Sequence, residues 1–311
     1  MIKLEQTVKR FGEFAALNGA DMEIPAGTAF GLLGSNGAGK STILRLISGV
    51  YKPDGGRVTI DGRDVYDDPA VMEKVFFIND ETVQFGSMTL GDLKRFYSGF
   101  YPKFDKELFD GLCRAVNLPE KRRLDTFSKG MKRQAVVITG LSSGTEILLL
   151  DEAFDGLDPT MRIIVKRMLV DAMLDRQLTV IISSHNLAEI NEMCDTVTML
   201  HQGKILFTRD IDSVKGDVHK VQCAFASAPD ESRIAALSPL HHEVSGSVHY
   251  IIMKGSEEDI RKAMEPLSPS FCDVIPLTLE EVFIYEMEGL GYSADMLRAV
   301  SGKEAETNVS K

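Results

Sequence analysis

Gly34-Ser35-Asn36-Gly37-Ala38-Gly39-Lys40-Ser41-Thr42 follows an apolar run at residues 29–33 and precedes apolar residues at helical spacing over 43–47. A strand, a glycine-rich loop and a helix in this order are the context in which such a loop binds phosphate. The glycines let backbone N–H groups approach phosphate oxygens, and the helix N-terminus adds unpaired N–H groups. Lys40 can reach the β- and γ-phosphates of a nucleotide, and the hydroxyl of Ser41 can bind Mg²⁺. The stretch therefore predicts a nucleotide-binding loop.

The composition of the 311 residues excludes several classes of protein. Hydrophobic residues make up 44% of the chain and charged residues 26%, as in soluble globular proteins. The formal net charge of −11 argues against nucleic acid or an anionic lipid surface as a partner. The four cysteines are far apart and predict reduced thiols in the cytoplasm. No apolar run approaches the roughly 20 residues that a membrane helix needs, and the start lacks a signal-peptide pattern.

Hydrophobic patterning predicts an α/β fold. Residues 2–8 and 19–24 are expected to pair as strands, and residues 57–62 to form a hairpin, which together predict an antiparallel β subdomain. All-apolar runs are typical of central strands in a parallel sheet. Such runs occupy residues 29–33, 75–78, 147–150 and 178–183.

Residues 80–145 have a different hydrophobic pattern, with helical spacing, and predict a helical subdomain inserted into this core. Thr89 and Asp92 resemble a capping box, and aromatic residues between Phe85 and Phe109 recur at helical spacing. These aromatics fit either a core or a groove for a partner's cytoplasmic helix. A polar loop over 127–134 is expected to precede a helix at 135–141.

The composition shifts after about residue 212, which predicts a main domain over 1–212, a small α+β domain over 213–288 and a flexible tail over 289–311. Strands are expected at 218–226, 243–254 and 271–275, and helices at 256–267 and 278–287.

Two acids, Asp151 and Glu152, follow the apolar run at 147–150. Ligands gather at the carboxyl ends of parallel strands, so Asp151 is a candidate for the coordination of Mg²⁺ and Glu152 for the general base. A solvated turn is the alternative reading of an acidic pair on its own. Asp158 and Pro159 can begin a helix, and Asn186 with Glu189 forms a second expected cap pair.

Taken in order, these motifs over residues 2–210 resemble the ATP-binding subunit of ABC transporters. The motifs are Gly34 to Thr42, Phe127-Ser128-Lys129-Gly130-Met131, Ile147 to Glu152, Gly156-Leu157-Asp158 and His185. The resemblance implies a P-loop NTPase core and a head-to-tail dimer, homomeric or heteromeric, with two ATP molecules between the subunits. Ser128 and Gly130 would contact the γ-phosphate of the ATP held by the partner's Lys40. A polar helix cap is the simpler reading of this loop.

The same resemblance assigns roles to three more residues. His185 would hydrogen-bond the γ-phosphate, Phe11 would stack on adenine, and Asp158 would cross the dimer to the other phosphate loop. Phe11 can also be a core residue at a strand end, and Asp158 a helix cap; for Asp158 both roles are compatible.

Two departures from the family pattern are visible. Phe127, Lys129 and Met131 replace three residues of the usual Leu-Ser-Gly-Gly-Gln. The family places a metal-binding glutamine after the strand at 75–78, whereas Asp80 stands there, between Asn79 and Glu81, with Gln84 as a further substitute. An acidic oxygen at Asp80 would still suit Mg²⁺.

The function implied is a cytoplasmic ATPase subunit that dimerises on ATP and powers a separate transmembrane permease at the inner face of the cell membrane, in export. The end of the appendage, residues 277–283, resembles the extension of exporter-type subunits. One alternative is an ABC-type ATPase that acts on ribosomes, DNA or cluster assembly without a permease. Another is a regulator that binds ATP without hydrolysing it.

Overall fold

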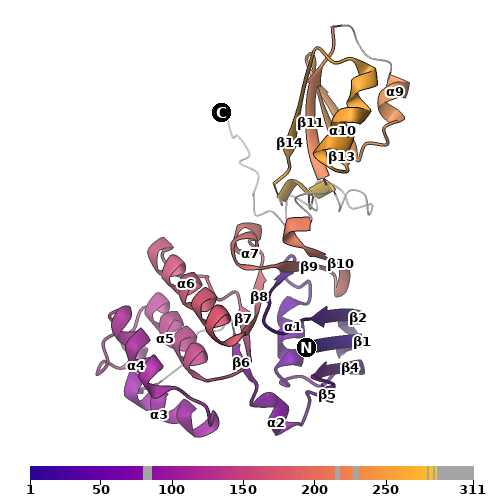
Figure 1. Ribbon diagram of the computed structural model, residues 1–311. Helices are drawn as coiled ribbons and strands as arrows, with labels where there is room; N and C mark the ends of the chain where they lie inside the picture. Colours follow the sequence, from indigo (N-terminus) through magenta and orange to yellow (C-terminus); the bar gives the residue numbers. More distant parts are fainter. Residues whose placement is uncertain (80–85, 214–217, 227–230, 279, 283, 286–311) are drawn as a thin grey trace, which may run out of the picture. The chain divides into compact units, whose positions relative to one another are not determined.

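A mainly parallel sheet carries the glycine-rich loop near its centre in the computed structural model (Figure 1). The structure describes residues 1–311 except 80–85, 214–217, 227–230, 279, 283 and 286–311. The strands of this sheet are β3 (Ala29–Leu33), β6 (Val75–Ile78), β7 (Ile147–Asp151), β8 (Thr179–Ser184), β9 (Thr196–His201) and β10 (Lys204–Asp210). They lie in the order β10-β9-β3-β8-β7-β6, and β3 pairs in parallel with both β8 and β9. The carboxyl ends of β3, β7 and β8 therefore meet at one edge, because β7 also pairs in parallel with β8.

An antiparallel sheet accompanies the parallel one in the same compact unit, Met1–Thr208. Its strands are β1 (Ile2–Phe11), β2 (Phe14–Ile24), β4 (Gly55–Ile60) and β5 (Arg63–Asp64), in the order β2-β1-β4-β5. The helices of this unit are α1 (Lys40–Ile47), α2 (Pro69–Met72), α3 (Leu90–Phe100), α4 (Lys106–Ala115), α5 (Lys129–Ser142), α6 (Pro159–Arg176) and α7 (Leu187–Met193), with a 3₁₀ turn at Leu124–Thr126.

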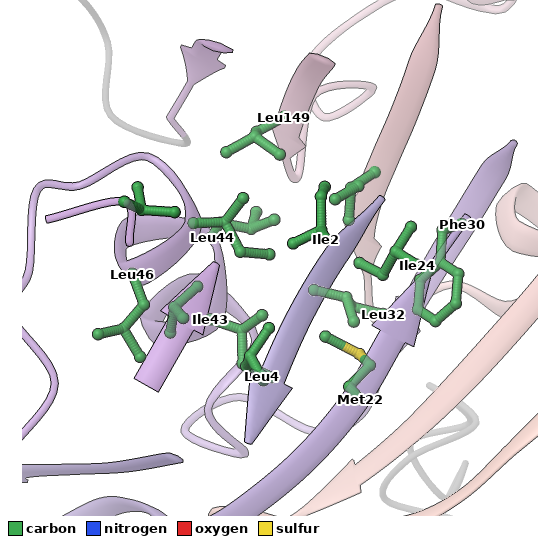
Figure 2. Close-up of a cluster of buried hydrophobic side chains, with 14 of the residues drawn as sticks. Ile2, Leu4, Met22, Ile24, Phe30, Leu32, Ile43, Leu44, Leu46 and Leu149 are labelled. Atoms are coloured by element: carbon green, nitrogen blue, oxygen red, sulfur yellow. The ribbon is translucent and has the colours of Figure 1, made fainter. Parts of the chain in front are cut away.

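Apolar side chains from both sheets and from α1 form one buried cluster (Figure 2). Ile43, Leu44, Leu46 and Ile47 are the buried apolar residues of α1, and their spacing is that of one helical face. The cluster also contains Ile2, Leu4, Met22, Ile24, Phe30, Leu32 and Leu149. This packing holds the N-terminus of α1, with Lys40, at the carboxyl end of β3.

Helices α3, α4 and α5 gather beside one another and form a helical part of this unit (Figure 1). Gly140 of α5 lies against the parallel sheet, where an added Cβ would come within 3.0 Å of Phe76 and 2.9 Å of Leu148. Thr89 accepts from the N–H of Asp92 and the side chain of Asp92 accepts in return, which confirms the predicted capping box at the start of α3.

The second unit begins at Arg209 and contains its own sheet, all of whose pairs are antiparallel. Its strands are β11 (Val218–Ala224), β12 (His241–Ser245), β13 (Val248–Lys254) and β14 (Phe271–Pro276), in the order β12-β13-β11-β14. Its described helices include α9 (Glu231–Ala235) and α10 (Glu257–Met264), followed by a 3₁₀ turn at Glu265–Leu267, and residues 280–282 are also helical. Ile234 of α9 and Ile260 of α10 belong to one buried cluster with strand residues such as Val221 and Ile251.

The predicted α/β class is confirmed, and several predicted boundaries are wrong. The helix expected at 135–141 begins at Lys129, because Ser128 already caps it. The strand expected at 243–254 is the hairpin of β12 and β13, since Gly246 turns the chain with a φ of 64°. The first hairpin is longer than predicted, with β1 reaching Phe11 and β2 starting at Phe14.

Two local predictions on helices also need correction. The aromatic region is interrupted between Phe100, where α3 ends, and Lys106, where α4 begins. Asn186 caps α7 through the N–H of Ala188, but Glu189 does not pair with it. Glu189 is buried and accepts from the hydroxyl of Ser184. The predicted tail, 289–311, lies outside the described residues. Among those that are described, no helix is both long and apolar enough to cross a bilayer.

Candidate active site

The loop after β3 closes tightly on neighbouring backbone. A Cβ atom at Gly34 would lie 2.4 Å from the carbonyl oxygen of Leu200. At Gly39, whose φ is 112°, a Cβ atom would lie 2.8 Å from the carbonyl oxygen of Ala16. Glycine is therefore required at both positions. Gly39 is the N-cap of α1 and brings no side chain to its first N–H groups, which leaves them available to an anion.

Lys40 is buried, with 5% of its surface exposed. Its ammonium donates to the carbonyl oxygens of Gly34 at 2.7 Å and Ser35 at 3.3 Å, and lies 3.6 Å from Oε1 of Glu152. Burial lowers the pKa of Lys40, although the charges of Glu152 and Asp151 act in the opposite direction. A phosphate group in the loop would add negative charge beside the ammonium and so stabilise its charged form further against the cost of burial.

Asp151, the last residue of β7, is fully buried. Its Oδ1 accepts from the hydroxyl of Ser41 at 3.1 Å and from the hydroxyl of Ser183. Its Oδ2 is also buried and has no hydrogen-bond partner within the described part of the chain. Mg²⁺ prefers oxygen ligands and keeps several of its waters. The unpartnered carboxylate oxygen and the nearby hydroxyl are two such ligands, and a buried carboxylate oxygen without a partner is unusual unless an ion or water binds it. Ser41 and Asp151 therefore fit the predicted metal.

Glu152 lies between Lys40 and His185. Its Oε2 is 3.0 Å from Nδ1 of His185, so the carboxylate links the ammonium and the imidazole in one row. Burial raises the pKa of Glu152, and Asp155 adds to this rise, while Lys40 and His185 oppose it. The carboxyl group therefore binds a proton more readily than an exposed glutamate does, as a general base should.

A pocket of about 220 Å³ opens beside Lys40 and Glu152. It is lined by Phe11, Phe14, Ala16, residues 36–42 and Glu152. Phe11 is 45% exposed and its ring lies 5.3 Å from that of Tyr51, so Phe11 is not the core residue of the alternative reading. Phe14 faces the same pocket and was not predicted, although the register pairs it with Phe11 across the hairpin. The hydroxyl of Ser183 was missed as well, because no local pattern links it to Asp151.

Ser128, Gly130 and Asp158 form a second group, and none of them belongs to the pocket's described lining. Ser128 caps α5 by accepting from the N–H of Met131 at 3.2 Å, and Asp158 caps α6 by accepting from the N–H of Met161 at 3.0 Å. A Cβ atom at Gly130 would lie 3.5 Å from the carbonyl oxygen of Gly156, which precedes Asp158. Two helix N-termini thus lie close together. Asp80, predicted as a metal ligand, and Gln84 lie outside the described residues.

The chain is similar to known ATP-binding proteins. The profile of a family described as ABC transporter matches residues 17–155. The ABC transporter ATP-binding protein YtrB of Bacillus subtilis is 29% identical over 293 residues, which cover 93% of this chain and 99% of YtrB. NatA, an ABC transporter ATP-binding protein of the same organism, is 30% identical over 69% of this chain and 91% of NatA.

Other similarities cover about two thirds of the chain. The sulfate/thiosulfate import ATP-binding protein CysA of Mycobacterium tuberculosis is 32% identical over 66% of this chain, which spans 60% of CysA. Among solved structures, an ATP-binding subunit of an ABC transporter has a TM-score of 0.64 at 22% identity, over 69% of this chain and 92% of that one. An ATP-binding cassette in a dimeric post-hydrolysis state with ADP and Pi has a TM-score of 0.61 at 19% identity, over 68% of this chain and 99% of that one. At these identities the two structures show a shared fold.

Proposed function

Because the chain belongs to the ABC transporter family of ATP-binding proteins, we propose how its residues share the work of an ATPase subunit that powers a transporter. Lys40 and the N–H groups of residues 34–42 bind the β- and γ-phosphates of ATP, and Phe11 with Phe14 contacts the adenine. The glycine requirement at the loop, its helix N-terminus and the two exposed aromatic rings support this assignment.

Glu152 takes a proton from the attacking water in this proposal, and His185 orients the carboxylate and reaches the γ-phosphate. The observation that carries the proposal is the row of Lys40, Glu152 and His185, with contacts of 3.6 Å and 3.0 Å, of which Lys40 and Glu152 line the pocket. When bound by Ser41 and Asp151, Mg²⁺ supplies charge neutralisation on the phosphate oxygens. The ammonium of Lys40 adds a second positive charge where negative charge develops.

A partner subunit completes the site in the proposal, with Ser128 and Gly130 directed at the partner's nucleotide and Asp158 at the partner's phosphate loop. These residues lie at two adjacent helix N-termini that offer N–H groups and partial positive charge to an anion, and they do not line their own pocket. The partner is a second copy of this chain or another ATPase subunit of the family.

We propose that ATP hydrolysis drives a separate transmembrane permease, which the subunit binds at the inner face of the cell membrane. We propose further that the direction of transport is outward. The similarity to YtrB covers 93% of the chain and so includes the second unit, whereas the similarity to CysA, an import protein by name, covers 66%. Inverted membrane vesicles that contain the complex test the direction, because an exporter accumulates its substrate inside them when ATP is added.

The proposal is tested most directly by Glu152→Gln, which keeps the shape of the side chain and removes its basicity. The variant should bind ATP with Mg²⁺, stop hydrolysing it and accumulate as a dimer in size-exclusion chromatography with light scattering. Lys40→Ala, as the control, should bind no ATP and stay monomeric. Hydrolysis at the normal rate by Glu152→Gln would refute the role of the base.

A further inference from the structure

The backbone of Glu152 has a conformation that is unusual for a residue with a side chain. Its φ is 46°, in the left-handed region where Cβ crowds the following carbonyl oxygen. Strained conformations of this kind persist only where surrounding contacts hold them, and they concentrate at functional sites. The contacts that hold Glu152 therefore bear on its function.

Both peptide groups of Glu152 are anchored. Its N–H lies 3.2 Å from the carbonyl oxygen and 3.3 Å from the hydroxyl of Ser183, on β8. Its carbonyl oxygen accepts from Nη2 of Arg133, on α5, at 3.0 Å and from the N–H of Asp155, within the same turn, at 3.1 Å. The conformation of Glu152 is thus fixed from two different elements, of which one is the helix that begins after Ser128.

Arg133 is suited to this anchoring by its burial and by its shape. It is 9% exposed, and its Nη1 also donates to the carbonyl oxygen of Asn79, just after β6, at 2.5 Å. The rigid fork of a guanidinium can serve two carbonyl oxygens at once, whereas the single ammonium of a lysine has no such fixed geometry. Arg133 therefore ties together α5, the end of β6 and the residue after β7.

We propose that Arg133 is a positioning residue for ATP hydrolysis, which holds the Glu152 peptide in the left-handed conformation from which the carboxylate meets His185. The inference rests on the proposed role of Glu152 as the base. Without the guanidinium, the Glu152 carbonyl oxygen loses its contact with α5 and keeps, among the described donors, the N–H of Asp155 three residues along the chain. The backbone is then free to relax towards a negative φ, which turns the carboxylate away from the 3.0 Å contact. Because Ser128 caps α5, the helix whose N-terminus offers a contact to the partner's nucleotide also positions the base in its own subunit.

The test is steady-state ATP hydrolysis by the full chain with Arg133→Met. We expect kcat to fall about 10- to 100-fold while KM for ATP with Mg²⁺ stays within about twofold, because the loss of a charged hydrogen bond acts on the base and not on the phosphate loop. Arg176→Met is the matched control. Arg176 donates from Nη2 to the carbonyl oxygen of Leu141 at the far end of α5, so its loss should leave kcat near the wild-type value.

Arg133→Lys covers the case in which Arg133→Met does not fold. It keeps one charge and should show a kcat between those of wild type and Arg133→Met, with KM unchanged. A wild-type kcat in either variant, or a rise in KM that accounts for the loss of activity, would overturn the inference.

A double-mutant cycle with Glu152→Gln separates positioning from general destabilisation. If Arg133 acts through Glu152, adding Arg133→Met to Glu152→Gln should not lower the residual kcat further. A second loss of the same size would show that Arg133 acts independently and would overturn the inference. If Glu152→Gln alone hydrolyses ATP normally, it is instead the proposed function of Glu152 that fails.

Discussion

Replacing Ser183 by alanine should destabilise the first unit by the value of one charge-assisted hydrogen bond. The Ser183 hydroxyl donates to Oδ1 of Asp151, whose other oxygen already lacks a partner among the described residues. A hydrogen bond to a buried charged group contributes about 1.5–3 kcal/mol. The N–H of Glu152, which also approaches this hydroxyl, keeps its contact with the Ser183 carbonyl oxygen, so it adds no second loss.

Calorimetry of the full chain without nucleotide measures this cost. An unfolding entropy of about 2.1 cal/mol/K per residue over Met1–Thr208 converts it to a fall in Tm of about 3–7 °C. Ser142→Ala is the matched control, because Ser142 is equally buried and its hydroxyl has no partner within the described structure. The Tm of Ser142→Ala should therefore stay close to that of the wild type.

The charge of Asp151 gives the decisive comparison. In an Asp151→Asn background the bond from Ser183 becomes neutral, and its loss should cost about 0.5–1.5 kcal/mol. The reasoning is refuted if Ser183→Ala lowers the free energy of unfolding no more than Ser142→Ala does. It is also refuted if Ser183→Ala lowers that free energy equally with Asn and with Asp at position 151.

Three further predictions concern the same site. Gly34→Ala places a Cβ atom 2.4 Å from the Leu200 carbonyl oxygen, so we expect a loss of about 3 kcal/mol or more in urea unfolding; full stability would contradict the geometry. His185→Ala removes a group that lowers the pKa of Glu152, so the carboxyl keeps its proton to higher pH and the acidic limb of the kcat profile should move upward in pH. Ser128→Arg should leave the ATP affinity of the separate chain unchanged in calorimetric titration and abolish the ATP-dependent dimer; retained dimers would remove Ser128 from the interface.

The parts of this molecule that the sequence predicts are those whose physical cause is local. The loop from Gly34 to Thr42, the acids after residues 147–150 and the capping box at Thr89 each depend on residues within a few positions of one another. Helical and strand periodicity also act over short stretches, so the α/β class follows from them. Boundaries were less certain because single caps and turns decide them, as Ser128 does for α5 and Gly246 for the hairpin of β12 and β13.

The contacts that adjust the site could not be predicted because they join distant residues. Arg133 is 54 positions from Asn79 and 19 from Glu152, and Ser183 is 32 positions from Asp151. Such pairs become visible only once the strand order brings β6, β7 and β8 side by side. Phe14 is a milder case, since its role depends on how far the first hairpin extends.

The unpredicted contacts from Ser183 and Arg133 to Asp151 and Glu152 share one effect, because they constrain the two acids at the end of β7. Asp151 is buried with one oxygen unpartnered, and Glu152 is held with a left-handed backbone and a raised pKa. Each of these states is unfavourable for a free residue, so the fold must stabilise them through Ser183 from β8 and Arg133 from α5. The side chains that define the chemistry are thus recognisable along the chain, while their geometry depends on residues whose positions in the sequence indicate nothing. Substitutions at Ser183 and Arg133 should for this reason change the rate of hydrolysis more than the affinity for ATP.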